Sequence, residues 1–474
     1  MQFDDYRAHD ALGLAALIRS GAVSRQEVMA CAMARLEAVN PRINAVTYLD
    51  AAAIQANAPI TGADGPFAGV PYFIKDLHAP VKGMPLTHGS RLFADNVFDF
   101  DAELVARLRR AGFVIAGRTN APEFGMNVST EPAFKGPTRN PWNLEHSAGG
   151  SSGGAAAAVA SGILPATHAT DSGGSIRIPA SCNGLIGLKP TRALLPYGPH
   201  RGDAAHGISH EHAVTRSVRD CAASLDATAG PDVGAPYFTP RPAVSYLDSI
   251  ARPPTALRIA FTTHDFAGKE VHEECRTAVE RTAMLLVGLG HTVEHRAPEF
   301  DHAALLDAVM TIMLTGLAAN VAAREQQLGR KARADELEPV THAAIAHGQS
   351  ITGMRYAAQF ARINREVRRI GQFFETVDLL LTPTMAAPPP RLGVLRTDGS
   401  DLDQFIANTF GLAPFTPSFN ATGQPAISLP LHWSADGLPI GVQLVGRFGA
   451  DAQLLALAAQ LEQAQPWFHR VPTL

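Results

Sequence analysis

The sequence holds few cysteines, and their spacing excludes two classes of protein. Four occur in 474 residues, at Cys31, Cys182, Cys221 and Cys275, and none belongs to a CxxC pair. This wide spacing suggests neither a disulfide framework nor a thiolate metal site. We therefore interpret all four as buried thiols.

The sequence also lacks a strong charge of either sign and a long apolar run. Its 40 Lys and Arg against 44 Asp and Glu give a formal net charge of −4, which provides no general attraction to nucleic acid or to an anionic membrane. No uninterrupted apolar run approaches the ~20 residues that span a bilayer. The acidic, polar start MQFDDYRAHD is unlike a secretory signal. These absences predict a cytoplasmic protein with neither a nucleic-acid nor a membrane partner.

What is present is an alternation of helical and strand-like segments, the pattern of an α/β protein. The length of 474 residues exceeds the usual single-core size, so that size alone suggests two or three domains. We expect strands at 71–77, 114–116, 257–261, 292–293, 377–381, 426–429 and 440–445, and helices at 10–40, 101–110, 155–160, 271–289 and 451–464, with a further helix after Ser217 and a helix-rich region at 302–375.

The sequence also predicts where individual helices begin and end, and which segments are loops. Asn40-Pro41 is expected to end the first long helix, and Asp101 to cap the helix that follows it. Residues 141–146 have the composition of a loop. The apolar run from Met310 to Ala323 suits a core helix or a pocket wall, and we favour the core.

The most unusual stretch is glycine- and serine-rich and covers residues 149–191. Ser151 and Ser175 each follow a Gly-Gly pair, and a small-residue helix and a turn separate them. Without side chains, the glycines before Ser175 allow successive backbone N–H groups to face one concavity, as an oxyanion requires. Ser175 would then supply the nucleophilic hydroxyl and Ser151 a hydroxyl relay. The alternative is that both serines only shape glycine-rich turns.

Lys75 is the candidate base that completes a hydrolytic centre with Ser175 and Ser151, and such a centre needs no histidine. It ends an apolar strand-like run at 71–77, where burial would lower the pKa from its ordinary value of about 10.4 and leave a neutral amine. The alternative is a strand-end salt bridge with Asp76.

Three other motifs bear on the kind of site that the chain contains. Residues 149–153 fit the GxSxG elbow of α/β-hydrolases, which would make Ser151 the nucleophile and require a downstream Asp and His. His210-Glu211-His212 resembles the HxH pair of metal-dependent amidohydrolases, although no HExxH is present and packing histidines are the simpler interpretation. Residues 184–189 depart from a Walker loop in spacing, so that a nucleotide site is not supported.

Taken together, residues 149–191 resemble the signature of the amidase signature family of Ser-cisSer-Lys hydrolases. The segments that carry this resemblance are Gly-Gly-Ser-Ser-Gly-Gly at 149–154, Asp171 to Arg177, Pro179, Gly187 to Thr191, and the flanking pieces 69–76, 117–120, 381–384 and 420–426. They cover nearly the whole chain.

The resemblance implies roles for these residues. Ser175 would be the nucleophile, Ser151 the cis-peptide serine that passes protons, and Lys75 the base. Backbone N–H groups of Ser172, Gly173, Gly174 and Ser175 would form the oxyanion hole, with Asp171 and Arg177 bracing the loop. No metal and no cofactor would be needed.

The family also implies a fold of one large α/β/α domain around a mixed central sheet flanked by helices, in place of the several domains that size suggests. We expect a helical N-terminal arm at 1–65 and the amidase signature domain at 66–474. That domain would divide into a catalytic core at 66–230, a more variable helical and α/β region at 231–375, and C-terminal strands and a helix at 376–474.

Within the family the chain looks most like 6-aminohexanoate cyclic dimer hydrolases and related aryl-acylamide or urethane-cleaving amidases, on segments 138–144, 178–181 and 460–467. The implied function is hydrolysis of a small-molecule amide, linear or cyclic, with anilides and carbamates left open. Met126 and Asn127, with part of 302–330, are candidates for the acyl pocket. The rival is the glutaminase subunit of a tRNA-dependent amidotransferase, whose pattern has Gln where Ile178 stands. A homodimer is left open.

Overall fold

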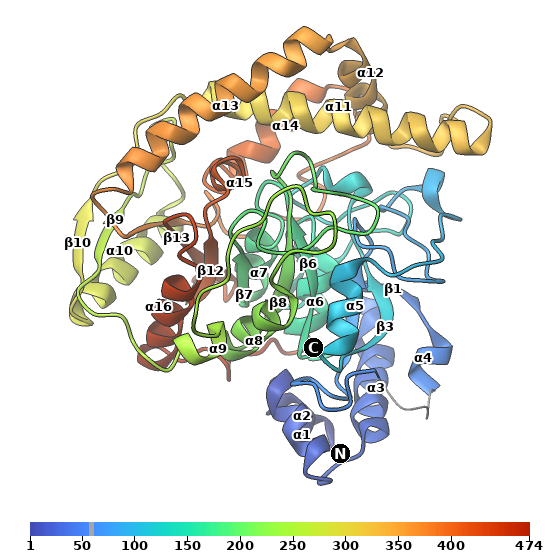
Figure 1. Ribbon diagram of the computed structural model, residues 1–474, viewed down its shortest axis with the longest axis vertical. Helices are drawn as coiled ribbons and strands as arrows, with labels where there is room; N and C mark the ends of the chain where they lie inside the picture. Colours follow the sequence, from blue (N-terminus) through green and yellow to red (C-terminus); the bar gives the residue numbers. More distant parts are fainter. Residues whose placement is uncertain (56–60) are drawn as a thin grey trace.

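The apolar runs of the sequence become strands, and most of these join one mixed sheet. Within residues 1–55 and 61–474, which the computed structural model describes, the large sheet has the order β10-β9-β11-β13-β12-β7-β8-β6 and a smaller sheet the order β1-β3-β2 (Figure 1). The strands are β1 (Val46–Leu49), β2 (Pro71–Lys75), β3 (Val114–Thr119), β4 (Arg139–Asn140), β5 (Asn143–Ser147), β6 (Ala166–Asp171), β7 (Ile186–Lys189), β8 (His210–Thr215), β9 (Arg258–Phe261), β10 (Thr292–His295), β11 (Leu379–Pro383), β12 (Ala426–Trp433) and β13 (Pro439–Gly446).

The large sheet is parallel at one edge and antiparallel elsewhere. Strands β10, β9 and β11 run parallel to one another, whereas β11, β13, β12, β7, β8 and β6 pair antiparallel in turn. The predicted α/β class with a mixed central sheet is confirmed.

The small sheet lies beside the large one, with β2 next to β6. Thr167 of β6 donates its hydroxyl hydrogen to the carbonyl oxygen of Phe73 at 2.6 Å, and the backbone N–H of Lys75 donates to Nδ1 of His168 at 3.3 Å. Because β2 and β6 end near each other, the side chain of Lys75 meets the last residues of β6.

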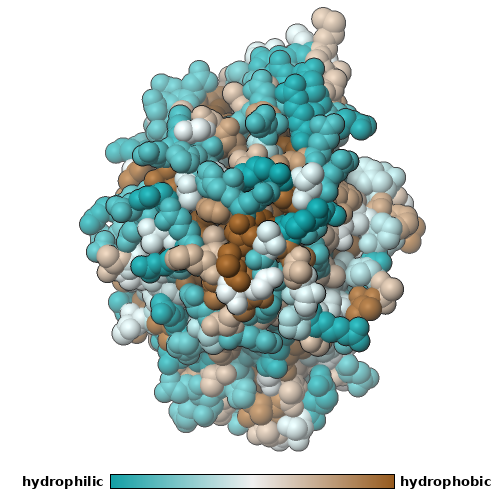
Figure 2. Space-filling model, turned by 90° about the vertical axis from the view of Figure 1, so that its left-hand side faces the viewer, coloured by the Kyte–Doolittle hydropathy of each residue, from teal (hydrophilic) through white to brown (hydrophobic). Residues whose placement is uncertain are grey.

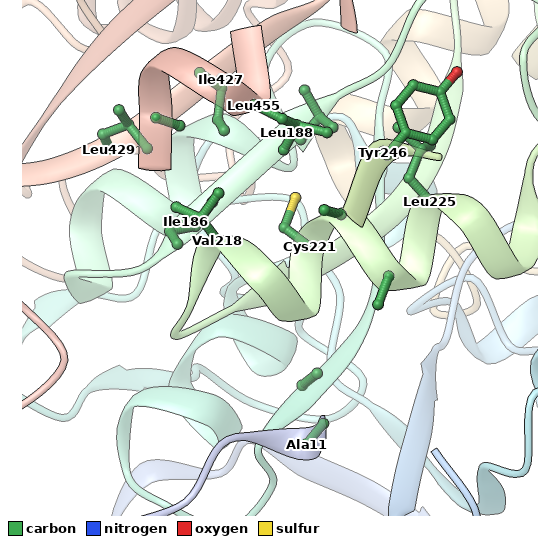
Figure 3. Packing of buried hydrophobic residues seen from close by; sticks show 14 of the residues in the cluster. Ala11, Ile186, Leu188, Val218, Cys221, Leu225, Tyr246, Ile427, Leu429 and Leu455 are labelled. Atoms are coloured by element: carbon green, nitrogen blue, oxygen red, sulfur yellow. The ribbon is translucent and has the colours of Figure 1, made fainter. Parts of the chain in front are cut away.

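Helices cover both faces of the sheet (Figure 1). Figure 3 shows one covering layer, in which Val218 and Cys221 of α8 pack with Ile186 of β7; α6 and α7 pack with the opposite face. The helices are α1 (Phe3–Arg7), α2 (Ala11–Arg19), α3 (Arg25–Ile43), α4 (Ala51–Gln55), α5 (Glu103–Arg110), α6 (Gly153–Ala160), α7 (Arg177–Asn183), α8 (Val218–Thr228), α9 (Tyr246–Ser249), α10 (Glu273–Gly288), α11 (His302–Leu328), α12 (Pro339–Ser350), α13 (Gly353–Phe373), α14 (Leu402–Leu412), α15 (Pro417–Thr422) and α16 (Asp451–Ala464).

A separate group of helices, α11 to α14, crosses one end of the molecule (Figure 1). Helix α11 has 27 residues and is the one helix in the described part of the chain whose length and hydropathy would suffice to cross a membrane. Its apolar side chains divide among three clusters: one with α13 and α15, a second with α12 and α14, and a third with Leu92 and Phe93. The helix is therefore longer than the apolar run that predicted it.

Polar side chains cover most of the face seen in Figure 2, and apolar ones reach the surface in smaller areas between them. This distribution is ordinary for a folded chain, since polar atoms are too few to cover the whole surface.

Several local predictions differ from the structure. Helix α3 continues through Pro41 to Ile43, because a proline in the last turn removes only one backbone donor. Asp101 does not cap α5; Ala102 occupies that position, while Asp101 accepts the backbone N–H of Lys82 and pairs with Arg109.

Two segments predicted without strands contain them. Residues 143–147 form β5, which pairs with β4 in a two-stranded ribbon and also forms an antiparallel bridge from His146 to Arg391. Strand β6 lies between the helix and the turn expected before Ser175. The predicted helical arm at 1–65 likewise contains β1, while its part at 56–60 lies outside the described residues.

Of the cysteines, Cys182, Cys221 and Cys275 are buried, whereas Cys31 is half-buried.

Candidate active site

Lys75 and Ser151 meet in the interior of the protein. The Lys75 side chain is fully buried, and its Nζ lies 2.7 Å from Oγ of Ser151 and 2.8 Å from Oγ1 of Thr170. Burial lowers the pKa of Lys75 well below its ordinary value, and the carboxylates of Asp171 and Glu211 offset this only in part. The alternative interpretation, a salt bridge of Lys75 with Asp76, is absent from the ion pairs of the described residues; Asp76 instead accepts hydrogen bonds from Thr87. Burial therefore favours the uncharged form of this amine, which lies in contact with a hydroxyl.

Ser151 lies in a loop that only glycine can form at its first two positions. The peptide bond between Gly150 and Ser151 is cis. A Cβ on Gly150 would lie 2.4 Å from the carbonyl oxygen of Asn127, closer than any side chain tolerates. Thr130 donates its hydroxyl hydrogen to the carbonyl oxygen of Gly149 at 2.9 Å, which fixes the start of the loop against the segment 127–130.

Ser175 lies between β6 and α7, and 9% of its surface is exposed. It lines a cavity of about 400 Å³ together with Ser172 and Gly173. Throughout the described ranges, the hydrogen bonds include none between Ser151 and Ser175. Catalytic hydrogen bonds are often long before substrate binds, and the structure therefore brings two of the three predicted side chains into contact and leaves the third facing the cavity.

The carboxylate of Asp171 holds the glycine-rich turn. The backbone N–H of Gly174 donates to Oδ1 of Asp171 at 2.7 Å, and that of Ile176 donates to Oδ2 at 3.2 Å. The N–H of Gly174 is thus engaged by Asp171, and an oxyanion hole at Ser172 to Ser175 stays a prediction. The N–H groups of Ser172, Gly173 and Ser175 remain as candidate oxyanion donors.

Asp171 and Arg177 form a fully buried ion pair. Nε of Arg177 donates to Oδ2 of Asp171 at 2.9 Å and its second terminal nitrogen to Oδ1 at 2.8 Å. Burial would raise the pKa of Asp171, but the charge of Arg177 and hydrogen bonds from Arg177 and Asn420 outweigh it and hold that pKa well below its usual range. The remaining Arg177 donors reach Gln443 and Asn420. Both residues brace the loop, as the resemblance implies.

The cavity in front of Ser175 is mainly apolar. Helix α11 contributes Val309, Met310, Ile312, Met313, Leu314, Gly316, Leu317 and Asn320 to its lining. The run predicted as a core helix is therefore a pocket wall as well, and Val309, Ile312 and Leu314 both pack in buried clusters and line the cavity.

Met126 and Asn127, the predicted pocket residues, both line this cavity. The side chain of Asn127 is nevertheless occupied, because its amide donates to the carbonyl oxygen of Leu395 at 2.9 Å and its oxygen accepts the backbone N–H of Ser129 at 3.0 Å. Met126 can contact a ligand, whereas Asn127 mainly holds the loops that form the wall.

The alternative sites gain little from the structure. Ser151 contacts a lysine, whereas the GxSxG reading requires a histidine. His210 and His212 lie on one face of the buried strand β8 and Glu211 on the other, and residues 1–55 and 61–474 contain no group of three His, Cys, Asp or Glu side chains arranged to hold a metal ion.

Sequence reasoning gave no role to Thr170, Asn420 or Gln443. Asn420 lies in one of the flanking segments quoted above, and its amide donates to Asp171 at 2.9 Å. Thr170 lies five residues before Ser175, on a strand that the sequence pattern did not reveal. Had that strand been recognised, the alternation of its side chains would have indicated that Thr170 lies beside Lys75.

Comparison with known proteins points to one family. The family model described as Amidase matches residues 27–455. A 6-aminohexanoate-cyclic-dimer hydrolase of Paenarthrobacter ureafaciens is 39% identical over 477 residues, with 98% of this chain and 96% of the relative covered.

Solved structures agree in fold over the same length. The structure of 6-aminohexanoate cyclic dimer hydrolase complexed with substrate has a TM-score of 0.91 at 38% identity, and 98% of each chain is covered. A bacterial aryl acylamidase of the amidase signature enzymes has a TM-score of 0.86 at 28% identity, again with 98% of each chain covered.

Proposed function

Because this chain belongs to the amidase signature family, whose members named above hydrolyse amides, we propose that it cleaves a non-peptide carboxylic amide through an acyl-enzyme on Ser175. The substrate class is an apolar amide, linear or cyclic, with anilides and carbamates included. Lys75 and Ser151 carry the protons.

The first half of the reaction forms the ester. Oγ of Ser175 attacks the amide carbonyl carbon and gives its proton to Oγ of Ser151, while Ser151 gives its own proton to the neutral Nζ of Lys75. When the tetrahedral intermediate collapses, the carbon–nitrogen bond breaks, and the proton returns by the same path to the leaving amine. Water then hydrolyses the ester with the same relay.

The single observation that carries this proposal is the contact of a fully buried amine with the Ser151 hydroxyl at 2.7 Å. An exposed lysine would be protonated at neutral pH and unable to accept a proton. A buried one is neutral, since charge in a low-dielectric interior is costly. The site therefore supplies a base without histidine.

The oxyanion of the tetrahedral intermediate needs hydrogen-bond donors of its own, separate from the proton relay of Ser151 and Lys75. The N–H groups of Ser172, Gly173 and Ser175 are suited to this role, because the Asp171 carboxylate fixes the turn before substrate arrives. Preorganised donors of this kind contribute about 10²- to 10³-fold each to the rate.

The apolar lining supports the substrate class. A cavity of about 400 Å³ lies in the range of small-molecule sites and is walled by aliphatic side chains of α11. An acyl chain of methylene groups or an aromatic ring would bury its surface there.

The test is covalent labelling combined with a substrate screen. A fluorophosphonate probe should modify Ser175, identified by peptide mass spectrometry, and anilides, cyclic amides, aliphatic nitrophenyl amides and carbamates should be compared for turnover. Labelling of another serine, or of none, would contradict the proposed nucleophile.

The glutaminase-subunit alternative is not favoured. The relatives reported above are hydrolases of small amides, and Ile178 stands where that alternative's pattern has Gln. Full activity of the isolated chain on anilides, without copurifying subunits, would separate the two functions.

A further inference from the structure

The cavity that holds Ser175 also holds a charged side chain that the mechanism does not use. Arg201 lines the same cavity, from the loop that joins β7 to β8, and it is half-buried. The apolar wall of α11 lies in the same cavity. A guanidinium in such surroundings loses part of its hydration and needs a partner of opposite charge.

Arg201 has no such partner within the protein. Its only side-chain hydrogen bond among residues 1–55 and 61–474 runs to Nδ1 of His78, at 3.4 Å, and no carboxylate of these residues lies within the 4.0 Å of an ion pair. Asp203, two residues away on the same cavity wall, accepts a hydrogen bond from the Tyr237 hydroxyl at 2.7 Å. Glu211 acts on Arg201 only through space. Most of the five N–H donors of the guanidinium remain available.

His78 does not supply the missing charge. Burial lowers the pKa of His78 well below its ordinary value, and the charge of Arg201 lowers it further. The imidazole is therefore a neutral acceptor. It holds one edge of the guanidinium in place and leaves the opposite edge for a ligand in the cavity.

We propose that Arg201 binds a carboxylate carried by the substrate, so that the amides cleaved by this site are amido acids with an apolar spacer between carboxylate and amide. A carboxylate matches the forked donors of a guanidinium and forms two parallel charge-assisted hydrogen bonds. The spacer lies against the apolar wall of α11 while the amide carbonyl faces Ser175. This inference rests on the proposed amidase function and names the substrate class of that site.

Matched substrate pairs test the inference. Glutaryl 4-nitroanilide and pentanoyl 4-nitroanilide have acyl chains of equal length and differ in a terminal carboxylate. N-pentanoyl-6-aminohexanoate and N-pentanoylhexylamine place the same difference on the amine side. For each pair the quantity measured is the ratio of kcat/KM, charged over neutral, in wild type, Arg201→Gln and Arg201→Lys.

In at least one pair, wild type should prefer the charged member, and Arg201→Gln should lower that preference roughly ten- to a hundredfold, the range of a hydrogen bond to a charged group. Arg201→Lys should retain part of it, since the charge stays and the fork is lost. For the neutral member, the two Arg201 variants should lower kcat/KM much less than for the charged member, so that the ratio carries the effect of the carboxylate. The exposed Arg252 is the control position, and Arg252→Gln should match wild type.

Equal loss on both members of each pair, or no preference in wild type for either pair, would overturn the inference and leave the amidase function standing. Binding separates the two claims fully. Titration calorimetry with hexanoate should give at least about tenfold weaker binding to Arg201→Gln than to wild type, whereas equal binding would overturn the carboxylate site. Failure to cleave these four amides and every member of the wider substrate screen, cyclic amides and carbamates included, would contradict the proposed function instead.

Discussion

Two strands of this protein end in a fully buried lysine, and only one of these lysines contacts a hydroxyl of the site. Lys75 ends β2 and Lys189 ends β7, and burial lowers the pKa of each well below its ordinary value. Nζ of Lys75 lies beside Ser151 and Thr170, whereas Nζ of Lys189 donates to the carbonyl oxygen of Pro190 at 3.0 Å. A carbonyl cannot pass on a proton, and a hydroxyl can.

The comparison teaches that burial makes a base available and that its neighbour decides whether the base is used. Asp171 acts on both lysines through space and raises the pKa of each, while Arg177 and Arg192 lower that of Lys189 further, so that a lowered pKa does not by itself make a lysine part of the site. The distinction comes from β6, which places Thr170 next to Lys75, and from the loop that presents Ser151.

The largest effect should separate the two lysines directly. Lys75→Met should lower both amide hydrolysis and fluorophosphonate labelling of Ser175 by about 10²- to 10⁴-fold, the contribution of a general base. Lys189→Met should lower them by less than about tenfold, since Lys189 takes no part in proton transfer. Rates of nitroaniline release and of labelling provide the two readouts.

Circular dichroism and the thermal unfolding midpoint of each variant show whether it is folded. A folded Lys189→Met variant as inactive as Lys75→Met would remove the distinction between the two lysines.

Removal of the intermediate hydroxyl should have the next largest effect. Ser151→Ala should lower kcat by about 10²- to 10³-fold, because Lys75 then has no path to Ser175. The double variant with Lys75→Met should be scarcely slower than Lys75→Met alone, since groups that act as one unit give non-additive losses. Additive losses in this pair would show that the two side chains act independently.

The carboxylate of Asp171, which acts on both lysines, should be required for the stability of the folded protein. Asp171→Asn leaves Arg177 buried without a counter-charge, which should cost at least about 3 kcal/mol of unfolding free energy. Urea denaturation measures the loss.

The pH dependence has a defined sign. Because the pKa of Asp171 is lowered in the folded protein, its stabilising contribution is present above the ordinary Asp pKa of about 3.9 and declines as pH falls below that value towards the folded pKa. Asp171→Asn should lack this acid-dependent loss. A variant as stable as wild type at pH 7 would contradict the bracing role.

The smallest effect should come from the second neighbour of Lys75. Thr170→Val removes an acceptor that favours the charged amine, so that the pKa of Lys75 should fall further and the acid limb of the kcat/KM profile should move to lower pH. The expected loss at neutral pH is a few-fold, about the contribution of one hydrogen bond. Thr170→Ser retains the hydroxyl and serves as control. A shift of the acid limb to higher pH would contradict this role of Thr170.

The sequence contained most of the fold and the core of the site. Apolar strands and capped helices follow from local chemistry, and the segments around Ser151 and Ser175 carried the family resemblance. Lys75 was proposed as the base because it ends an apolar strand-like run, and the resemblance implies the same role. The second buried strand-end lysine, Lys189, was not predicted, because no strand was expected at 186–189.

What the sequence did not reveal depends on tertiary packing. Strand β6 has the sequence ATHATD, which lacks a strong apolar run. Its neighbouring strands and the residues that bury it come from distant segments, so that the local pattern did not indicate a strand. The commitment of the Gly174 amide to Asp171 and the cavity-facing side of α11 depend on side chains far apart in the chain. Arg201 gave no signal, because a single arginine in a loop is usually solvated.

The central claim is an uncharged amine at position 75, and the pH dependence of Ser175 phosphonylation tests it most directly. The account predicts a rate that has reached its plateau by about pH 8, with an acid limb well below the ordinary lysine value of about 10.4. A rate that is still rising tenfold per pH unit between about pH 8 and 10 would show a lysine of ordinary pKa, and the account would be wrong.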